Sequence, residues 1–323
     1  MSLKERLLPL FKEKGSGYLS GEEAARILGV SRTAVWKAMS ALKEDGYQIE
    51  AVTNKGYRLS DEHDVLSAEI IKDQLGVLSD RLDIEVKQKV TSTNALLKQA
   101  AADGAGEGTV IVAVEQTAGR GRFTRSFFSP VNSGVYMSIL LRPSIPADSA
   151  VLITTAAAVA VAEAAEALSG RKANIKWVND VLIGNRKICG ILTEAALNLE
   201  SGTLDFAVLG IGVNVYEPEG GFPGEIKDKA GAVFEKRGKD LRSRLAAEII
   251  KRFFVYYDSL ADKTFLDSYR RRCIVINREI TVISGSVTKN AVALGIDDSC
   301  RLHVKYSDGT EDFLSSGEIS IRL

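Results

Sequence analysis

Apolar and polar positions in the first sixty residues follow helical spacing, interrupted by short polar breaks. Ser20 and Glu23 have the spacing of a capping box, which predicts a short helix that begins there and ends at Gly29. Ser31 predicts the cap of a second helix. In that helix four apolar residues recur at i, i+3, i+4 and i+7 and predict one buried stripe: Val35, Ala38, Met39 and Leu42. Two short helices joined by a glycine-containing turn are therefore expected.

A β-hairpin is predicted directly after these helices. Strand-like residues 49–52 and 57–59 flank the turn Thr53-Asn54-Lys55-Gly56, which gives the hairpin a basic tip. Two short helices followed by a hairpin match the winged-helix plan, in which the second helix enters the DNA major groove. The alternative is a small helical packing domain whose surface charges are only solvated. The residues expected to contact DNA are Ser31, Arg32, Thr33, Trp36, Lys37 and Lys55.

Charge and composition restrict the kinds of chemistry that the chain can carry. The 323 residues include 42 Lys+Arg and 42 Asp+Glu, so any nucleic-acid signal must be local; the first sixty residues have ten Lys or Arg against seven Asp or Glu, a net charge of +3. The three cysteines are scattered singly, which argues against a disulfide framework and a zinc site and favours a reducing, cytoplasmic setting. The two histidines form no ligand-like cluster, and His63 is expected in an acidic linker. The chemistry must therefore rest on Lys, Arg, Asp and main-chain groups.

The longest apolar run, Ala150 to Leu168, approaches the length of a membrane span. Glu163 and Glu166 within it favour an Ala-rich buried helix instead, and Gly170 predicts its C-terminal end. A signal peptide is not expected, because charged residues break up the apolar run at the N-terminus. No membrane partner is predicted.

Helical and strand patterns mix between residues 66 and 269, as in an α/β or α+β catalytic domain. The first polar segment there is Val90-Thr91-Ser92-Thr93-Asn94, where a strand gives way to a helical run over 95–102. Hydroxyl and amide groups at such a junction can hydrogen-bond a small polar ligand. They can equally serve only as a helix cap.

The second segment runs from 112 to 129 and has Gln116-Thr117-Ala118-Gly119-Arg120-Gly121-Arg122-Phe123-Thr124-Arg125 at its centre. The glycines allow close backbone approach, while three arginines supply forks that bind phosphate oxygens bidentately. Such a loop suits a polyanion. The alternatives are a flexible basic surface loop and a fragment of an RNA-binding Gly/Arg tract, although that tract would need repeats that the sequence does not have.

The third segment covers 175–183 and 186–192 and predicts two apolar strands that enclose a turn. Lys187 enters the second strand just before Ile188. A lysine in a buried strand is costly unless it meets an anion, which makes Lys187 a candidate ligand of one. The alternative is that its side chain extends to the surface.

Together these segments resemble the biotin–protein ligase family. The shared motifs, in order, are Thr-Ser-Thr-Asn at 91–94, Gln-x-x-Gly-Arg-Gly-Arg at 116–122, Lys-Trp-x-Asn-Asp at 176–180, Gly-x-Arg-Lys-x-x-Gly-Ile-Leu at 184–192 and Gly-Ile-Gly-Val-Asn at 210–214. The residues 316–322 also look like the close of that family's small C-terminal β-barrel. With the winged helix in front, the resemblance points to the bifunctional ligase/biotin operon repressor branch.

The resemblance implies an α+β multidomain fold. We expect a winged-helix DNA-binding domain over 1–64 and a biotin- and ATP-binding catalytic domain over 65–270, similar to class II aminoacyl-tRNA synthetases and lipoate ligases. From residue 271 to 323, strand patterns such as 274–276, 279–283, 291–296, 302–306 and 319–322 alternate with turn residues and predict an SH3-like barrel. There Glu318 and Arg322 would support ATP or acceptor binding, or simply close the barrel.

Site residues carry over from the family motif by motif. Biotin would be held by Ser92, Thr93, Asn94, Gln116, Gly119, Arg120, Gly121, Arg122 and Lys187. ATP would be held by Arg120, Arg122, Arg125, Lys176, Trp177, Asn179, Lys187 and Asn214. The catalytic residues would be Lys187, Arg122 and Asp180. No protein metal cage is expected, because Mg²⁺ would bind through the ATP phosphates.

The implied reaction forms biotinyl-5′-AMP from biotin and ATP and passes biotin to a lysine of a biotin carboxyl carrier protein or another carboxylase domain. Unused adenylate would favour a homodimer that binds operator DNA. Two alternatives stay open: a lipoate–protein ligase-like enzyme, and a ligand-sensing repressor with an inactive ligase core. The arginine segment departs from the family pattern, since Phe123, Thr124 and Phe127 stand where Arg, Gly and Trp are common. Loss of that glycine should stiffen the loop, and Phe127 removes an indole N–H.

Overall fold

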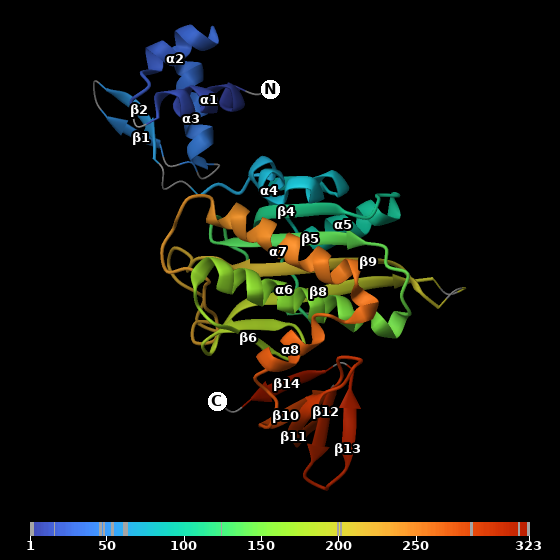
Figure 1. The fold of residues 1–323 in the computed structure, drawn as a ribbon. Coiled ribbons are helices and arrows are strands. Elements are labelled where there is room, and N and C mark those ends of the chain that lie inside the picture. Colours follow the sequence, from blue (N-terminus) through green and yellow to red (C-terminus); the bar gives the residue numbers. More distant parts are fainter. Residues whose placement is uncertain are drawn as a thin grey trace.

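The computed structural model describes residues 3–15, 17–44, 47, 49–52, 55–60, 64–123, 125–198, 200, 202–284, 287–315 and 317–321. Figure 1 shows three parts in chain order: a small helical part at the N-terminus, a central sheet with helices, and a β-rich part at the C-terminus. The N-terminal part has a hydrophobic core of its own, whereas the central and C-terminal parts share one continuous core.

The N-terminal part folds as its polar and apolar pattern predicts. It consists of α1 (Leu3–Lys14), α2 (Gly21–Leu28), α3 (Arg32–Glu44), β1 (Ile49–Val52) and β2 (Gly56–Leu59). The Ser20 hydroxyl accepts the backbone N–H of Glu23, and Gly29 ends α2 in the left-handed conformation. The Ser31 hydroxyl accepts the backbone N–H of Ala34 and so caps α3. The predicted apolar stripe of α3 is buried, and β1 pairs antiparallel with β2. Both caps, the stripe and the hairpin are confirmed.

The central part is built on a seven-stranded sheet with the order β3-β4-β5-β9-β8-β7-β6. The strands are β3 (Asp83–Val90), β4 (Thr109–Gln116), β5 (Gly134–Leu141), β6 (Ala173–Lys176), β7 (Asp180–Ile183), β8 (Arg186–Leu197) and β9 (Leu204–Asn214). The pair β3–β4 is parallel and every other pair is antiparallel. The prediction of two strands around one turn was wrong for 175–192, because residues 177–179 form a turn inside a largely apolar run and divide the first run into β6 and β7.

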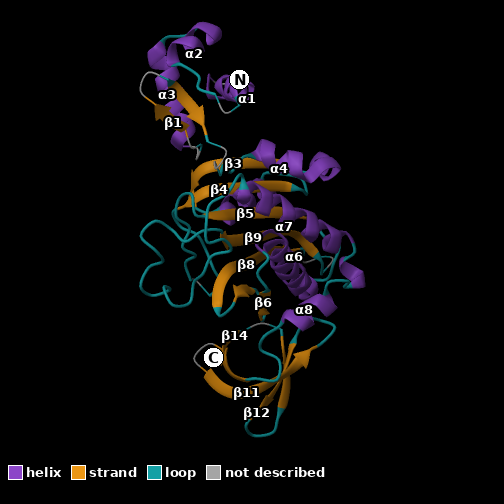
Figure 2. Cartoon of the chain, turned by 60° about the vertical axis from the view of Figure 1, so that its left-hand side comes forward, coloured by secondary structure: helices purple, strands orange, loops and turns teal. Residues whose placement is uncertain are grey.

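Helices cover the two faces of this sheet unequally. They are α4 (Ala68–Leu75), α5 (Thr93–Ala102), α6 (Val151–Ser169), α7 (Leu241–Asp258) and α8 (Leu266–Arg272), with short 3-10 turns at Gly76–Arg81, Ala147–Ala150 and Leu260–Asp262. Figure 2 shows α4, α6, α7 and α8 on one side of the sheet. The helix α5 packs instead with Ile111, Leu140 and Val208, which alternate along their strands with residues facing α6 and α7. The face that α5 covers also carries the polar motifs.

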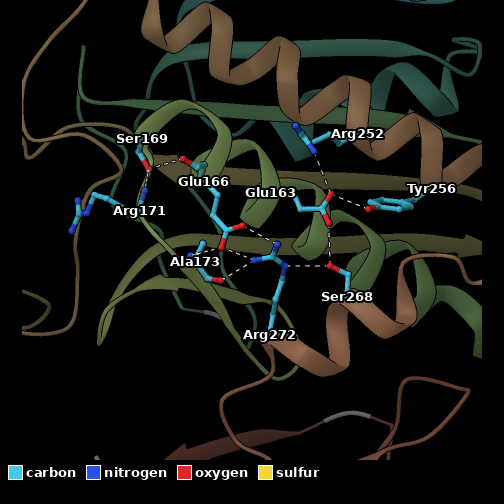
Figure 3. Close-up of polar contacts among 10 residues, drawn as sticks. Glu163, Glu166, Ser169, Arg171, Ala173, Arg252, Tyr256, Ser268 and Arg272 are labelled. Atoms are coloured by element: carbon cyan, nitrogen blue, oxygen red, sulfur yellow. Dashed lines mark hydrogen bonds and ion pairs between the residues drawn. The ribbon is translucent and has the colours of Figure 1, made fainter.

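The apolar run of the sequence forms α6, which lies inside the protein. It is the one helix among the described residues that is long and apolar enough to cross a membrane, and most of it is buried by its neighbours. Its two carboxylates are held by other helices (Figure 3): Glu166 pairs with Arg272 of α8, and Glu163 accepts bonds from Tyr256 of α7 and Ser268 of α8. Gly170 ends the helix in the left-handed conformation. The buried-helix prediction is confirmed.

The C-terminal part is a five-stranded antiparallel sheet with the order β13-β12-β11-β10-β14. Its strands are β10 (Glu279–Ser284), β11 (Val287–Ile296), β12 (Leu302–Tyr306), β13 (Glu311–Leu314) and β14 (Glu318–Ile321). The predicted strand at 274–276 is a turn, because its backbone leaves α8 and reaches back to the central sheet. The strand β13 was not predicted; its four residues begin with two carboxylates and have a weak apolar pattern.

The C-terminal part is joined to the central sheet by hydrogen bonds as well as by the shared core. The indole N–H of Trp177 donates to the carbonyl of Cys300 (3.1 Å), and the N–H of Ile274 donates to the carbonyl of Ile175 (2.9 Å). Trp177 is 3% exposed. The C-terminal part therefore fixes the turn between β6 and β7 through the Trp177 indole.

Candidate active site

A glycine notch on the α5 face of the sheet holds the side chain of Asn94. In register across three neighbouring strands lie Ser138 of β5, Gly210 of β9 and Leu192 of β8. A Cβ atom on Gly210 would lie 2.1 Å from the Asn94 Oδ1 atom, so the amide occupies space that only glycine leaves free. The Asn94 Nδ2 atom donates to the Leu192 carbonyl (3.3 Å) and to Glu194 (2.9 Å). The sheet register thus fixes where this amide lies.

The other residues of the Thr-Ser-Thr-Asn motif join a buried polar network. The Thr93 hydroxyl donates to Gln116 Oε1 (3.1 Å), and the Thr93 backbone N–H donates to the same atom (2.8 Å). The Gln116 Nε2 atom donates to Ser129 (3.1 Å). Ser92 is 3% exposed and stands at the N-cap of α5 without a side-chain capping bond, so capping alone does not explain the motif. These groups form one patch of oxygen acceptors and amide donors.

The arginine segment folds into a tight hairpin over the same face. The Phe127 N–H donates to the carbonyl of Gly119 (2.8 Å), and the Gly121 N–H donates to that of Arg125 (2.7 Å). A Cβ atom on Gly119 would lie 2.5 Å from the Phe127 carbonyl oxygen, so this glycine permits the close approach. Phe123 has a φ of 54°, a conformation that glycine adopts more easily. Arg120 and Arg125 are exposed, and Thr124 lies outside the described residues.

A second row of the sheet, two residues along, receives the ring of Phe127. Tyr136, Gly212 and Gly190 stand in register on β5, β9 and β8. A Cβ atom would lie 2.6 Å from the Phe127 ring at Gly212 and 3.2 Å from it at Gly190. The Tyr136 ring packs edge-on at 6.4 Å between centroids, and burial raises the pKa of its hydroxyl to about 12. Asn94 and Phe127 thus fill the two glycine rows, and these rows together with the polar patch of Thr93 and Gln116 are called the seat of the arginine segment.

The turn between β6 and β7 brings the main cations of the site together. Arg122 Nη1 donates to Asn179 Oδ1 (3.2 Å), and Lys187 Nζ lies 2.6 Å from the carboxylate of the next residue, Asp180. Asn179 is itself fixed, because its Nδ2 atom donates to the Ile191 carbonyl (2.8 Å) and its carbonyl accepts the Ile191 N–H (3.1 Å). Arg122 and Lys187 therefore converge on two adjacent residues.

A cavity of about 170 Å³ adjoins Arg122. It is lined by Arg122, Ala150, Val151, Thr154, Val178, Ile191, Leu192, Thr193 and Ser315. Among the residues that the structure describes, no group of three or more His, Cys, Asp or Glu is arranged to hold a metal ion.

The expected nucleotide residues separate into two places. Lys176 lies opposite Asp180 in the β6–β7 register, and Asn214 at the end of β9 donates to the Gly231 carbonyl (3.1 Å). The indole N–H of Trp177, which was expected to touch ATP, donates to the Cys300 carbonyl of the C-terminal part. The predicted roles of Glu318 and Arg322 concern a side chain and a residue that lie outside the described part of the chain.

Three features of the site escaped the sequence analysis. Ser138 lies in an apolar strand and gave no signal of its own. The alternation of Gly210 and Gly212 in an otherwise apolar strand was a usable signal, since glycine inside a strand often marks close approach of another group. The long connection between β9 and α7 passes beside Lys187: the Lys187 N–H donates to the Lys229 carbonyl, and the Gly231 N–H donates to that of Lys187.

The surface of α3 presents the predicted DNA-contacting residues to solvent. Arg32, Thr33 and Lys37 are exposed, and Trp36 is 59% exposed. On the hairpin, the Nζ atom of Lys55 lies 5.8 Å from the centroid of the Tyr18 ring, and the Cζ atom of Arg58 lies 5.3 Å from it. Thr53 and Asn54 of the hairpin tip lie outside the described residues.

Comparisons with known proteins agree with these three parts. The model of the biotin/lipoate A/B protein ligase family matches residues 86–214, a helix-turn-helix (HTH) domain matches 3–58, and the biotin protein ligase C-terminal domain matches 275–322. The bifunctional ligase/repressor BirA of Bacillus spizizenii is 35% identical over 322 residues, covering 98% of both chains. The chain belongs to the bifunctional biotin–protein ligase/repressor family. BirA of Escherichia coli is 29% identical over 310 residues, covering 94% of this chain and 92% of that protein.

A solved structure is similar to about three quarters of the chain. The biotin protein ligase from Aquifex aeolicus in complex with biotin and ATP superposes with a TM-score of 0.60 at 25% identity, covering 74% of this chain and 98% of the other.

Proposed function

We propose that this protein is an ATP-dependent biotin–protein ligase that also acts as a biotin-responsive repressor. One observation carries the enzymatic half: Arg122 and Lys187 converge on Asn179 and Asp180, at the edge of a polar seat that ends at Gln116. A ligase of this kind must hold a carboxylate and a triphosphate within bonding distance, and two cations at one turn supply the charge to do so.

In the first step an oxygen of the biotin carboxylate attacks the α-phosphorus of MgATP, and pyrophosphate leaves. Lys187 would contact the carboxylate and the α-phosphate, while Arg122 would neutralise the charge that builds on the phosphoryl oxygens. Magnesium enters as part of the nucleotide substrate. The Lys187 Nζ atom lies 2.6 Å from the Asp180 carboxylate. When ATP binds, its phosphate oxygens would replace Asp180 as the partner of Lys187.

In the second step the neutral amine of the acceptor lysine attacks the carbonyl carbon of biotinyl-5′-AMP, AMP leaves, and the amine loses a proton. Asp180, freed from Lys187, stands where it can orient that amine. Biotin would lie beside the glycine rows, with Ser92, Thr93, Asn94 and Gln116 around its ureido ring and Gly119 to Arg122 above it. ATP would extend over Arg125, Lys176, Asn179 and Asn214.

The repressor half rests on the exposed face of α3 and on the hairpin next to it. Arg32, Lys37 and the 59% exposed Trp36 form a face suited to a major groove, and Lys55 lies on the adjacent hairpin. We infer that unused adenylate stabilises the closed arginine segment, favours a homodimer and pairs two winged helices on an operator. Plentiful acceptor would consume the adenylate and relieve repression.

The finer architecture belongs to the same proposal. The division into 1–64, 65–270 and 271–323 is supported by the separate N-terminal core and by the end of α8 at Arg272. We infer a class II synthetase-like catalytic domain, an SH3-like C-terminal barrel and a cytoplasmic setting. The acceptor would be a biotin carboxyl carrier protein or a similar carboxylase domain.

Mass spectrometry of a carrier-domain lysine after incubation with biotin and MgATP tests the proposal. We expect the mass of one biotin to be added at that lysine. Modification by lipoate but not biotin would instead favour a lipoate–protein ligase. Release of one equivalent of pyrophosphate without acceptor turnover would favour a ligand-sensing repressor with an inactive ligase core.

A further inference from the structure

We propose that Ser138, supported by Glu194, is a positioning residue that makes the seat selective for a ligand with N–H donors. The inference rests on the proposed ligase function and deepens it, because it names the group behind the biotin-binding motif. Ser138 lies in the middle of β5, belongs to none of the sequence motifs, and is 0% exposed.

Ser138 joins the two motif residues that face the seat. Its hydroxyl lies 2.7 Å from Thr93 Oγ1 and 2.6 Å from Asn94 Oδ1, and it donates toward both. A single hydroxyl proton thus serves two acceptors. The Thr93 hydroxyl in turn donates to Gln116 Oε1, so one chain of hydrogen bonds runs from β5 through α5 to the end of β4.

The orientation of the Asn94 amide follows from this arrangement. Both Nδ2 hydrogens are directed at acceptors, one at the Leu192 carbonyl and one at Glu194 Oε2. The Oδ1 atom must then face Ser138. The Lys98 ammonium holds Glu194 in place at 2.7 Å. Burial acts to raise the pKa of the Glu194 carboxyl, but the hydrogen bonds from Lys98 and Asn94 together outweigh it and lower that pKa. The amide cannot flip without leaving buried groups unsatisfied.

The resulting seat is rich in acceptors. Thr93 Oγ1 and Asn94 Oδ1 each accept one hydrogen bond from Ser138 and keep a further acceptor position, whereas Gln116 Oε1 already accepts two hydrogen bonds from Thr93. A ligand gains most there if it brings N–H groups, as a cyclic urea does. A dithiolane ring carries no N–H and would leave these oxygens with no added donor. Ser138 therefore contributes to the choice between biotin and lipoate by fixing which atoms point to the ligand.

The experiment introduces Ser138→Ala into the full-length protein and measures kcat and the KM values for biotin and for MgATP by steady-state kinetics. We expect the KM for biotin to rise about tenfold, the upper range for one net hydrogen bond, while the KM for MgATP and kcat stay near wild type. An analogue methylated at one ureido nitrogen provides the specific readout. Wild type should discriminate against it more strongly than Ser138→Ala does, because the acceptors lose their fixed orientation.

Thr155→Val is the matched control, since it removes an equally buried hydroxyl on α6, on the other face of the sheet. It should leave the KM for biotin unchanged. An unchanged biotin KM in Ser138→Ala, or parallel rises for biotin and MgATP, would overturn the inference. If Thr155→Val raised the KM for biotin as much as Ser138→Ala does, the inference would also be overturned, because the effect would then reflect a general loss of structure.

Glu194→Ala keeps the inference testable if Ser138→Ala does not fold. The Glu194 side chain is 25% exposed, so its removal is tolerated more easily than a change at Ser138. Glu194→Ala should raise the KM for biotin several-fold and leave the KM for MgATP unchanged. An unchanged KM for biotin in this variant would overturn the inference. Wild-type protein that does not adenylate biotin at all would instead refute the proposed function, so the two failures are distinguishable.

Discussion

Asp64 and Arg242 form a buried ion pair that joins the end of the N-terminal segment to the first turn of α7. The Arg242 Nε atom lies 3.1 Å from Asp64 Oδ2, and the two side chains are 1% and 2% exposed. Arg242 Nη2 also donates to the Asp64 carbonyl, and its backbone N–H donates to Asp64 Oδ1. Four residues separate β2 from Asp64, which limits the tether of the winged helix to roughly 17 Å.

The same guanidinium reaches the segment that follows the arginine hairpin. Arg242 Nη1 donates to Asn132 Oδ1 (3.3 Å), and Asn132 comes five residues after Phe127. The Arg242 side chain thus connects Asp64, at the end of the N-terminal segment, with Asn132, which follows the arginine hairpin over the candidate site. Linkage between ligand and DNA would have a short physical route here.

Replacing Asp64 by Asn should be costly, because it leaves a buried guanidinium without its counter-charge. We expect the free energy of unfolding to fall by about 3–5 kcal/mol, measured by urea denaturation. Asp258→Asn is the matched control, since the Arg81–Asp258 pair has side chains that are 53% and 47% exposed. The control should lose no more than about 1 kcal/mol. Equal losses in the two variants would contradict this account of the anchor.

Lys187→Ala should abolish adenylate formation while the fold remains intact. The variant leaves Asp180 without its cation 2.6 Å away and removes a charge that the carboxylate and α-phosphate would share. Biotin-dependent pyrophosphate release is the measurement. Lys87→Ala, which removes a lysine paired with Glu85 on the edge strand β3, should retain full activity. Near-normal release from Lys187→Ala would exclude the catalytic role.

Gly212→Ala should open the arginine hairpin. The new Cβ would lie 2.6 Å from the Phe127 ring, so the ring and the backbone bonded to Gly119 must move. Overpacking of about 1–3 kcal/mol should translate into roughly 5- to 150-fold faster escape of the adenylate, measured by filter binding of the radiolabelled intermediate. Gly224→Ala is the control, because no atom lies within 4 Å of its added Cβ. Retention equal to wild type in Gly212→Ala would show that Phe127 does not hold the hairpin closed.

Local signals explain which parts of the fold could be read from the sequence. The caps at Ser20 and Ser31 and the end of α6 at Gly170 depend on residues within one or two turns, and all three were correct. The division of 175–183 failed because a continuous apolar run hides a tight turn. The strand 274–276 failed because its apolar residues serve a turn packed on the central sheet.

The site was predictable only as far as its motifs extend. Arg122, Lys187 and Asp180 were expected together, and the structure brings them to one turn. The row of Ser138, Gly210 and Leu192 depends on the register of three strands, which no local pattern encodes. The position of Trp177 depends on Cys300, over a hundred residues away in the chain, so its burial against the C-terminal part could not be foreseen.

Trp177→Phe should loosen the contact between the catalytic sheet and the C-terminal part. The change removes the indole N–H that satisfies the Cys300 carbonyl, at a cost of about 1–3 kcal/mol in the free energy of unfolding. Trp36→Phe, at a side chain that is 59% exposed, should stay within about 0.5 kcal/mol and lower operator affinity instead. A raised KM for MgATP in Trp177→Phe with unchanged stability would instead support the predicted contact of Trp177 with the nucleotide.

Acid should weaken the connection between α6 and α8 through Glu166. Its hydrogen bond and ion pair with Arg272, 2.7 Å away, hold the pKa of the Glu166 carboxyl below its ordinary value of 4.5. A carboxyl whose pKa is lower in the folded state contributes stability above its unfolded pKa, and that contribution is lost as pH falls through the folded value. Glu166→Gln should therefore be less stable than wild type at neutral pH, with a difference that shrinks below pH 4.5 in thermal unfolding. A constant difference across this range would mean that Glu166 stabilises the helices by packing rather than by charge.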